Sequence, residues 1–260
     1  MGFRSSALAY PAGVAPGFDP THPAMGNFVY PPFSAVARSN GFQSILDGKY
    51  GVDTGSVPIS NDNVLGVTAK YSSTGTNTTL FANSNAGPLP ALSAMTFAAI
   101  FKVIGTTGAS QVLLTNQTGG GGTCLATFGA SITYPRLVRL GIDSVDFTTI
   151  TDLVGVPCFI AASTNGIFNA VGNTAWCVLR RLDTGAVFVG TFGTNTQGNQ
   201  YANNGFYVGS SQGSGATRSA NAFISSVMFS QNSLSLAQLL QWADAPWSFW
   251  YPNANDFLQG

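Results

Sequence analysis

Few residues in this chain are able to carry acid–base or metal chemistry. All ten acidic residues are aspartates, since the 260-residue sequence contains no glutamate, and the single histidine is His22, in a proline-rich N-terminal stretch. General acid–base catalysis usually depends on histidine or on a carboxyl group whose pKa is raised towards neutrality. A zinc site needs a cluster of histidine, cysteine and carboxylate ligands. The residue types therefore favour a scaffold or a binding module over an enzyme, and they predict no catalytic residue, metal site or cofactor.

The aspartates offer one close pair and one polar cluster. Asp143 and Asp146 are the closest pair in sequence that a two-carboxylate hydrolysis would need. Their position at the end of a predicted strand is more typical of a turn cap. Asp62 lies between Asn61 and Asn63, and side-chain oxygens of this kind are the ligands that calcium prefers. We expect both groups to hold turns, with calcium binding as the alternative.

The charge content excludes several classes of partner. Charged residues make up only 8% of the chain, the net charge is zero and the pI is about 6.5. Typical soluble domains carry about 25% charged residues. Without a basic patch, nothing steers the protein to nucleic acid or to an anionic membrane. No stretch reaches the roughly 18 apolar residues of a membrane-spanning helix. A polar, uncharged surface suits a protein that works in an assembly or outside a cell.

The three cysteines are Cys124, Cys158 and Cys177. An odd number argues against a complete disulfide framework. Cys158 and Cys177 lie within apolar runs, which predicts buried free thiols. One disulfide remains the alternative.

The first 33 residues predict an extended arm. Six of the thirteen prolines lie before residue 33, and proline favours extended backbone in itself and in the residue before it. Aromatic residues at intervals along this arm should bury their rings on something, either their own domain or a partner chain. The candidate partner-binding residues are Tyr10, Phe18, Phe28, Tyr30 and Phe33.

Residues 34–250 predict a single all-β domain, followed by a tail at 251–260. Short apolar or alternating runs are separated by clusters of Gly, Asn, Ser and Thr, which is typical of a two-sheet sandwich. Gly185 is expected at positive φ in a hairpin turn. The predicted strands are Val64–Tyr71, Thr78–Ala82, Met95–Ile104, Gln111–Thr115, Cys124–Gly129, Arg136–Ile142, Val156–Ser163, Ala175–Leu182, Ala186–Thr191, Gly205–Val208 and Ala222–Phe229.

One short C-terminal helix is expected over Leu236–Ala243. Ser235 is its N-cap, and Gln238 three residues later completes a capping box. Pro246 prevents its continuation. The segment after the helix holds four aromatic rings between Pro246 and Pro252. These rings either close the core or form a binding surface, because clustered Trp and Tyr serve both purposes.

Several segments resemble concanavalin A-like lectin/glucanase domains of the laminin G-like type. Met95–Val103, Val156–Ser163 and Phe206–Gly209 are similar to strands of that family. Ala222–Phe229, leading into Leu234–Leu240, is similar to its closing segment. The ending Ala245–Phe249 resembles the end of bacteriophage-encoded members. The resemblance covers roughly residues 60–250 and implies a jelly-roll sandwich.

The resemblance implies a non-enzymatic bacteriophage virion protein, of the capsid decoration or head-fibre type, anchored by its N-terminal arm. Its partners would be capsid or other virion proteins, and it would be a homo-oligomer located in the virion. The glycosidases of this family carry two Glu beside an Asp, and this chain has no Glu. The alternative is a carbohydrate-binding module or a phage receptor-binding adhesin that contacts a host-surface glycan. Its candidate platform is Tyr201, Tyr207, Trp247 and Trp250.

Overall fold

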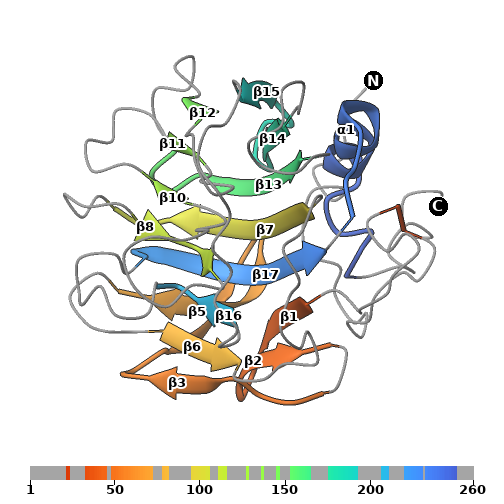
Figure 1. Ribbon diagram of the computed structural model, residues 1–260. Helices are drawn as coiled ribbons and strands as arrows, with labels where there is room; N and C mark the ends of the chain where they lie inside the picture. The colour runs from red at the N-terminus through yellow and green to blue at the C-terminus, as the bar shows by residue number, and fades with distance from the viewer. Residues whose placement is uncertain are drawn as a thin grey trace, which may run out of the picture.

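The described residues form an all-β sandwich with one short helix near the C-terminal end, as predicted (Figure 1). The computed structural model describes residues 22–23, 33–45, 48–72, 78–81, 95–105, 111–115, 127–128, 136–137, 145–146, 153–164, 175–192, 206–210, 220–230 and 232–250. The strands are β1 Phe33–Arg38, β2 Gly41–Ser44, β3 Val52–Thr54, β4 Ile59–Asp62, β5 Gly66–Tyr71, β6 Thr78–Phe81, β7 Met95–Val103, β8 Gln111–Val112, β9 Leu114–Thr115, β10 Thr127–Phe128, β11 Arg136–Leu137, β12 Val145–Asp146, β13 Pro157–Thr164, β14 Ala175–Arg181, β15 Val187–Phe192, β16 Phe206–Val208 and β17 Ala222–Ser230. The helix is α1 Leu236–Asp244.

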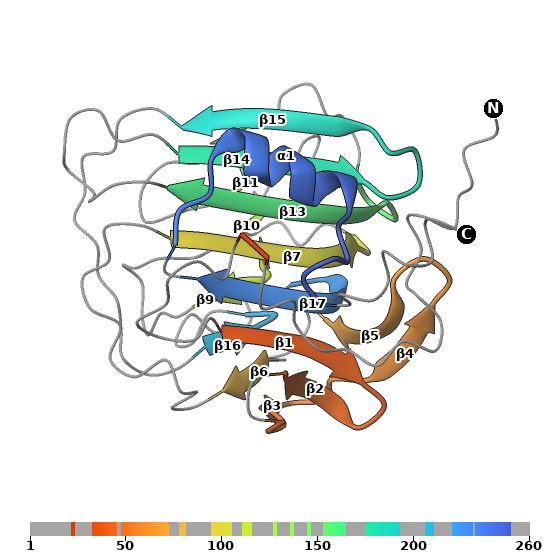
Figure 2. The ribbon, with the colours of Figure 1, turned by 90° about the vertical axis from the view of Figure 1, so that its right-hand side faces the viewer.

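Nine antiparallel strands form the larger sheet. Its main path is β15-β14-β13-β7-β17-β1-β2, while β5 pairs with the first part of β17 and carries β4 beside it (Figure 2). The ladder between β17 and β7 has an irregularity between Ile224 and Ser226. The residue in between, Ser225, donates a hydrogen bond from Oγ to the carbonyl of Leu65 at 3.1 Å. This bulge therefore joins β17 to the turn between β4 and β5.

A smaller sheet, β3-β6-β16-β9, packs against one face of the larger one. Two further ladders, β8 with β10 and β11 with β12, are short. A polar contact crosses the core between the sheets. The Tyr71 hydroxyl lies 2.8 Å from Thr79 Oγ1, which donates to Asp53 Oδ1 at 2.5 Å. Burial raises the pKa of Tyr71, so the phenol stays protonated. Because the Thr79 hydroxyl donates to Asp53, the Tyr71 hydroxyl donates a hydrogen bond to Thr79 Oγ1.

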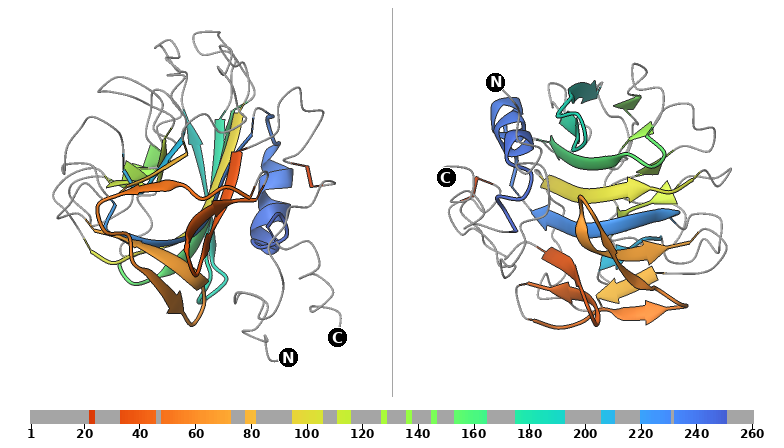
Figure 3. Two further views of the ribbon diagram at one scale, coloured as in Figure 1. Left: turned by 90° about the horizontal axis from the view of Figure 1, so that it is seen from below. Right: turned by 180° about the vertical axis from the view of Figure 1, so that it is seen from behind.

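The other face of the larger sheet is covered by helix α1 and residues 246–250 (Figure 3). The Trp242 ring of the helix lies 5.4 Å from the Phe159 ring of β13, and 5.8 Å from the Trp250 ring. Trp250 Nε1 donates to Ser34 Oγ of β1 at 3.0 Å. We call α1 with residues 246–250 the outer layer. It gives the domain a third layer on the sandwich.

Burial on both faces explains the continuous apolar runs in the sequence. In β7, Phe97 and Phe101 face the smaller sheet, while Ala98 and Ile100 face the outer layer. A strand with one solvated face would alternate apolar and polar residues, whereas a strand covered on both faces does not. The strands β7, β13 and β17 therefore form the centre of the molecule.

The N-terminal segment contacts its own domain at His22. The imidazole is 7% exposed, and its ring centroid lies 4.5 Å from that of Trp242 and 5.4 Å from that of Phe249. The chain's single histidine is thus packed against the outer layer. The rest of the predicted arm, apart from Pro23 and Phe33, lies outside the described residues, as does the tail 251–260.

Several local predictions are confirmed. The Ser235 side chain accepts from the backbone of Gln238, and the Gln238 side chain accepts from the backbone of Ser235. Gly185 has φ 75° in the turn between β14 and β15. Cys158 and Cys177 are buried free thiols. The strands β1 to β4 and β12 were not among the predicted strands.

No helix within the described residues combines the length and the apolarity needed to cross a bilayer.

Gly209 provides a test of the packing between the sheets. It has φ +83°, and an added Cβ would overlap the Tyr71 ring. We expect Gly209→Ala to lower the free energy of unfolding by about 2–4 kcal/mol, through steric overlap added to backbone strain. Gly155→Ala is the matched control, since Gly155 has φ +78° but nothing within 4 Å of an added Cβ. Gly155→Ala should lower the free energy of unfolding by about 1 kcal/mol. Equal losses in urea unfolding would contradict the described packing of Tyr71.

Candidate functional site

The rings predicted as a sugar platform lie inside the molecule. Trp247 and Trp250 are 4% and 0% exposed within the outer layer, and Tyr207 of β16 is 3% exposed. A buried ring has no free face on which a sugar can stack. In this structure the C-terminal aromatic segment closes the core, which was the other interpretation of its sequence. Tyr201 lies outside the described residues.

The predicted partner-binding arm is also only partly described. Phe33 begins β1, is 2% exposed, and stacks on Phe206 with ring centroids 4.3 Å apart and an interplanar angle of 5°. Its ring belongs to the core between the two sheets, so it is not available to a partner chain. The other four candidates, Tyr10, Phe18, Phe28 and Tyr30, lie outside the described residues.

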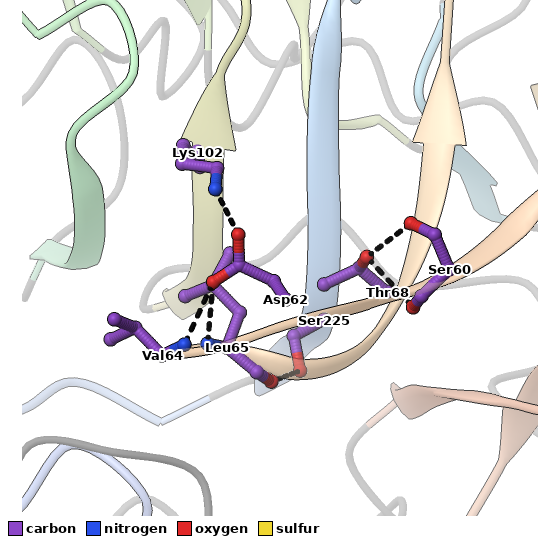
Figure 4. A network of polar contacts seen from close by, with 7 residues as sticks. All are labelled: Ser60, Asp62, Val64, Leu65, Thr68, Lys102 and Ser225. Carbon is purple, nitrogen blue, oxygen red and sulfur yellow. Dashed lines mark hydrogen bonds and ion pairs between the residues drawn. The ribbon is translucent and has the colours of Figure 1, made fainter.

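Asp62 is engaged by its own domain (Figure 4). Its carboxylate forms an ion pair with Lys102 and accepts the backbone N–H groups of Val64 and Leu65 at 2.9 and 3.0 Å. Burial alone would raise the pKa of Asp62, but the hydrogen bonds from Lys102, Leu65 and Val64 outweigh it and hold the pKa below its usual value. The side chain therefore stays charged and fixes the turn between β4 and β5.

This arrangement suits a structural role for Asp62 better than a calcium site. The Lys102 ammonium already occupies the position that a cation would take. Among the described residues, no three His, Cys, Asp or Glu side chains come together as metal ligands. Asp143 lies outside the described residues, and only the backbone of Asp146 is described, in β12.

An open aromatic surface occurs instead at Tyr50. Among the described side chains, Tyr50 is the one aromatic ring more than a third exposed, at 44%. It bridges to Gln43 at the outer edge of β2, just before the chain crosses to the smaller sheet at β3. Backbone bonds hold it on both sides: Ser44 N–H donates to the Lys49 carbonyl at 2.8 Å, and Gly51 N–H donates to the Phe42 carbonyl at 2.9 Å.

Polar groups adjoin the exposed ring. Arg38 lies opposite Gly41 in the ladder between β1 and β2, and its Nε donates to Gln43 Oε1 at 3.1 Å. Gln43 Nε2 in turn donates to the Gly48 carbonyl at 2.8 Å. A Cβ added to Gly41 would lie 3.5 Å from Tyr50 Cδ1, so the ring borders the glycine directly.

We call Arg38, Gly41, Gln43 and Tyr50 the Tyr50 corner. It combines a partly exposed aromatic ring with a guanidinium and an amide, and the small glycine lies between the ring and Arg38. An apolar ring flanked by fixed hydrogen-bonding groups is the combination that binds a ligand with both C–H and hydroxyl surface.

Sequence reasoning did not find this site. The strongest aromatic signal in the sequence is the cluster near the C-terminus, and the apolar neighbours of that cluster bury it. The available signal for Tyr50 was its immediate context, Gly48-Lys49-Tyr50-Gly51, in which a lysine and two glycines surround the ring. Arg38 and Gln43 come together with Tyr50 only through the pairing of β1, β2 and residue 50, and β1 and β2 were not predicted.

The Asp62 ion pair gives a prediction with a defined pH dependence. Asp62→Asn should lower the free energy of unfolding by about 1–2 kcal/mol at pH 7, because the partly buried ion pair with Lys102 is lost. The folded-state pKa of Asp62 is depressed, so its stabilisation is present above about pH 4 and is lost as the pH falls through the folded-state pKa. The difference between variant and wild type should therefore shrink at acid pH in urea unfolding.

Asp183→Asn is the matched control for this measurement. Asp183 also pairs with a basic side chain, Arg181, at 2.7 Å, but its side chain is 36% exposed against 12% for Asp62. Exposed ion pairs contribute about 0.5 kcal/mol. If Asp183→Asn lowers the free energy of unfolding as much as Asp62→Asn does, the contacts around Asp62 have no special importance for stability.

No family model matches the chain, and no curated protein matches its sequence. Solved structures do resemble it. One is the binding domain of Paraclostridial Mosquitocidal Protein 1, with a TM-score of 0.55 and 10% identity over 81% of this chain and 51% of that chain. Another is the binding domain of Botulinum Neurotoxin DC in complex with SialylT, with a TM-score of 0.52 and 9% identity over 82% of this chain and 50% of that chain.

A third similar structure is a receptor binding domain, with a TM-score of 0.52 and 8% identity over 82% of this chain and 50% of that chain. This chain spans about half the length of each of the three chains. At such low identity the likeness concerns the fold alone. The chain shares a β-sandwich with binding domains of toxins and with a receptor binding domain.

Proposed function

We propose that this protein is a non-enzymatic carbohydrate-binding module that contacts its ligand at the Tyr50 corner. The observation that carries the proposal is the exposed Tyr50 ring, held by backbone bonds and flanked by the side chains of Arg38 and Gln43. This site replaces the buried rings that the sequence suggested. The function corresponds to the alternative drawn from the sequence rather than to its leading interpretation.

Binding at the corner would join two modest contributions. The C–H face of a sugar packs against the Tyr50 ring and removes apolar surface from water. The hydroxyl groups exchange hydrogen bonds with the amide of Gln43 and the guanidinium of Arg38. Since Gln43 is already held by the Gly48 carbonyl, little side-chain entropy is lost on binding. One ring and two polar groups are consistent with a Kd near the millimolar range, about −4 kcal/mol.

The structural neighbours support this direction. They are binding domains, and one of them was solved in complex with SialylT. The residue chemistry supports the absence of catalysis: the chain has no glutamate, and Asp62 is held in an ion pair with Lys102. A host-surface glycan is therefore the partner we propose.

The Tyr50 ring is the direct test of this function. The protein and Tyr50→Ala are compared on a glycan array, with the best ligand followed by titration calorimetry. We expect wild type to bind and the variant to lose at least about tenfold in affinity, or 1.4 kcal/mol. Tyr50→Trp should retain binding because it keeps a flat apolar ring. Val52→Ala, at a neighbouring side chain that is 66% exposed, is the control for an unspecific surface change.

Two outcomes would contradict the proposal. An array without any bound glycan would remove the function itself. Binding that survives in Tyr50→Ala would keep the function but move the site away from this corner.

A place in a bacteriophage particle, with capsid or other virion proteins as partners, stays a prediction from the sequence resemblance. So does the homo-oligomer, for which strand β15 is the position where a second copy would add. β15 ends the path of the larger sheet, and its exposed side chains Val187 and Val189 are accompanied by no charged residue or proline. Charged residues and prolines usually protect an edge strand from pairing with another chain. At the opposite end, β2 is covered by the bridge from Tyr50.

The edge strand can be tested through the mass in solution. If copies pair through β15, light scattering should give an oligomer for wild type and a smaller species for Val189→Lys, because the lysine would face its counterpart across the new ladder. Val52→Lys places the same charge on the other sheet and should leave the mass unchanged. A monomeric wild type, or equal masses for all three proteins, would exclude this mode of assembly.

A further inference from the structure

Several basic side chains of the described chain form ion pairs with aspartates, whereas Arg38 at the Tyr50 corner does not. Arg180 Nη1 lies 2.8 Å from Asp244 Oδ1, Arg181 lies 2.7 Å from Asp183, and Lys102 pairs with Asp62. Within the described part of the chain, the guanidinium of Arg38 has no carboxylate partner. Its hydrogen bond goes to the neutral amide of Gln43.

Arg38 is nevertheless fixed in direction. The bond from its Nε to Gln43 Oε1 is 3.1 Å long, and the same amide is anchored through Nε2 to the Gly48 carbonyl at 2.8 Å. A guanidinium has five N–H donors in a planar fork, and this bond uses only one. The remaining donors suit an oxyanion that accepts two parallel hydrogen bonds.

Gly41 makes the space between this cation and the ring. It lies directly opposite Arg38 in the ladder, and a Cβ at that position would approach Tyr50 Cδ1 to 3.5 Å. Any larger side chain would therefore stand between Arg38 and Tyr50. Because the residue is glycine, a ligand on the ring reaches towards the guanidinium without an obstacle from residue 41.

We propose that the Tyr50 corner selects anionic saccharides, with the sugar ring on Tyr50 and a carboxylate or sulfate on Arg38. The inference rests on the proposed carbohydrate-binding function and specifies its ligand class. The net charge of the protein is zero, so long-range steering contributes little and selectivity comes from short-range contacts. A neutral sugar of the same shape brings no counterion to the Arg38 guanidinium, which has none among the described residues, whereas an acidic sugar supplies one.

The experiment uses an array on which each acidic glycan is printed beside its neutral counterpart. Sialylated glycans are paired with their desialylated forms, uronic acid glycans with their carboxyl-reduced forms, and sulfated glycans with their desulfated forms. Carboxylate and sulfate ligands are thereby distinguished from each other. The best pair is then titrated against wild type, Arg38→Gln and Lys70→Gln at two salt concentrations.

Lys70→Gln is the matched control because it removes the same charge from an exposed residue elsewhere on the larger sheet, on β5. We expect wild type to bind the acidic member at least about tenfold more tightly than the neutral one. Arg38→Gln should abolish this preference while leaving the weak binding of the neutral member, and Lys70→Gln should behave as wild type. Added salt should weaken the binding of the acidic glycan and leave the binding of the neutral glycan unchanged.

The failures of the two proposals are distinguishable. Equal binding of acidic and neutral members overturns the anionic selectivity and leaves carbohydrate binding intact. If Arg38→Gln and Lys70→Gln lose the preference for the acidic glycan equally, that preference comes from overall charge, and the role of Arg38 is overturned. An array on which nothing binds overturns the proposed function and this inference together.

Discussion

The structure depends on burying the central strands of the larger sheet on both faces. β7, β13 and β17 contact the smaller sheet on one side and the outer layer on the other. Each additional layer removes apolar side chains such as Ile100 and Phe159 from water, and the hydrophobic effect scales with that area. With only 8% charged residues, the chain has few ion pairs to add. Its stability therefore rests mainly on packing, and both broad faces of the central sheet are occupied by the protein itself.

The predictability of the fold from sequence followed the same physics. The apolar runs of β7 and β13 and the capping box at Ser235 are local patterns, and they led to the correct elements. The first four strands escaped prediction because their sequences are short and mixed, and because β1 and β3 pair with strands further along the chain. β1, for example, pairs with β17, so that Phe33 lies opposite Phe229.

The candidate site was harder to predict because exposure is a tertiary property. The sequence near Trp247 and Trp250 carries the strongest aromatic signal, yet both rings are buried in the cluster under the outer layer. Tyr50 stands alone in the sequence and owes its accessibility to the edge of the sheet, where none of the described layers covers it. The same residue type therefore takes opposite roles, and only the surrounding packing distinguishes them.

The residues of the Tyr50 corner all fall between positions 38 and 50, on a single hairpin and the strand crossing that follows it. One short contiguous segment therefore forms the whole contact surface. Such a segment can be replaced as a unit, whereas a cleft assembled from distant segments cannot. Phe42 packs in the core between the two sheets, and Ile45 packs against the cluster under the outer layer, so both tie this stretch to the body of the domain. Variation within it would thus alter what the domain recognises while the three-layer body stays the same, which offers a compact unit for grafting onto other sandwiches.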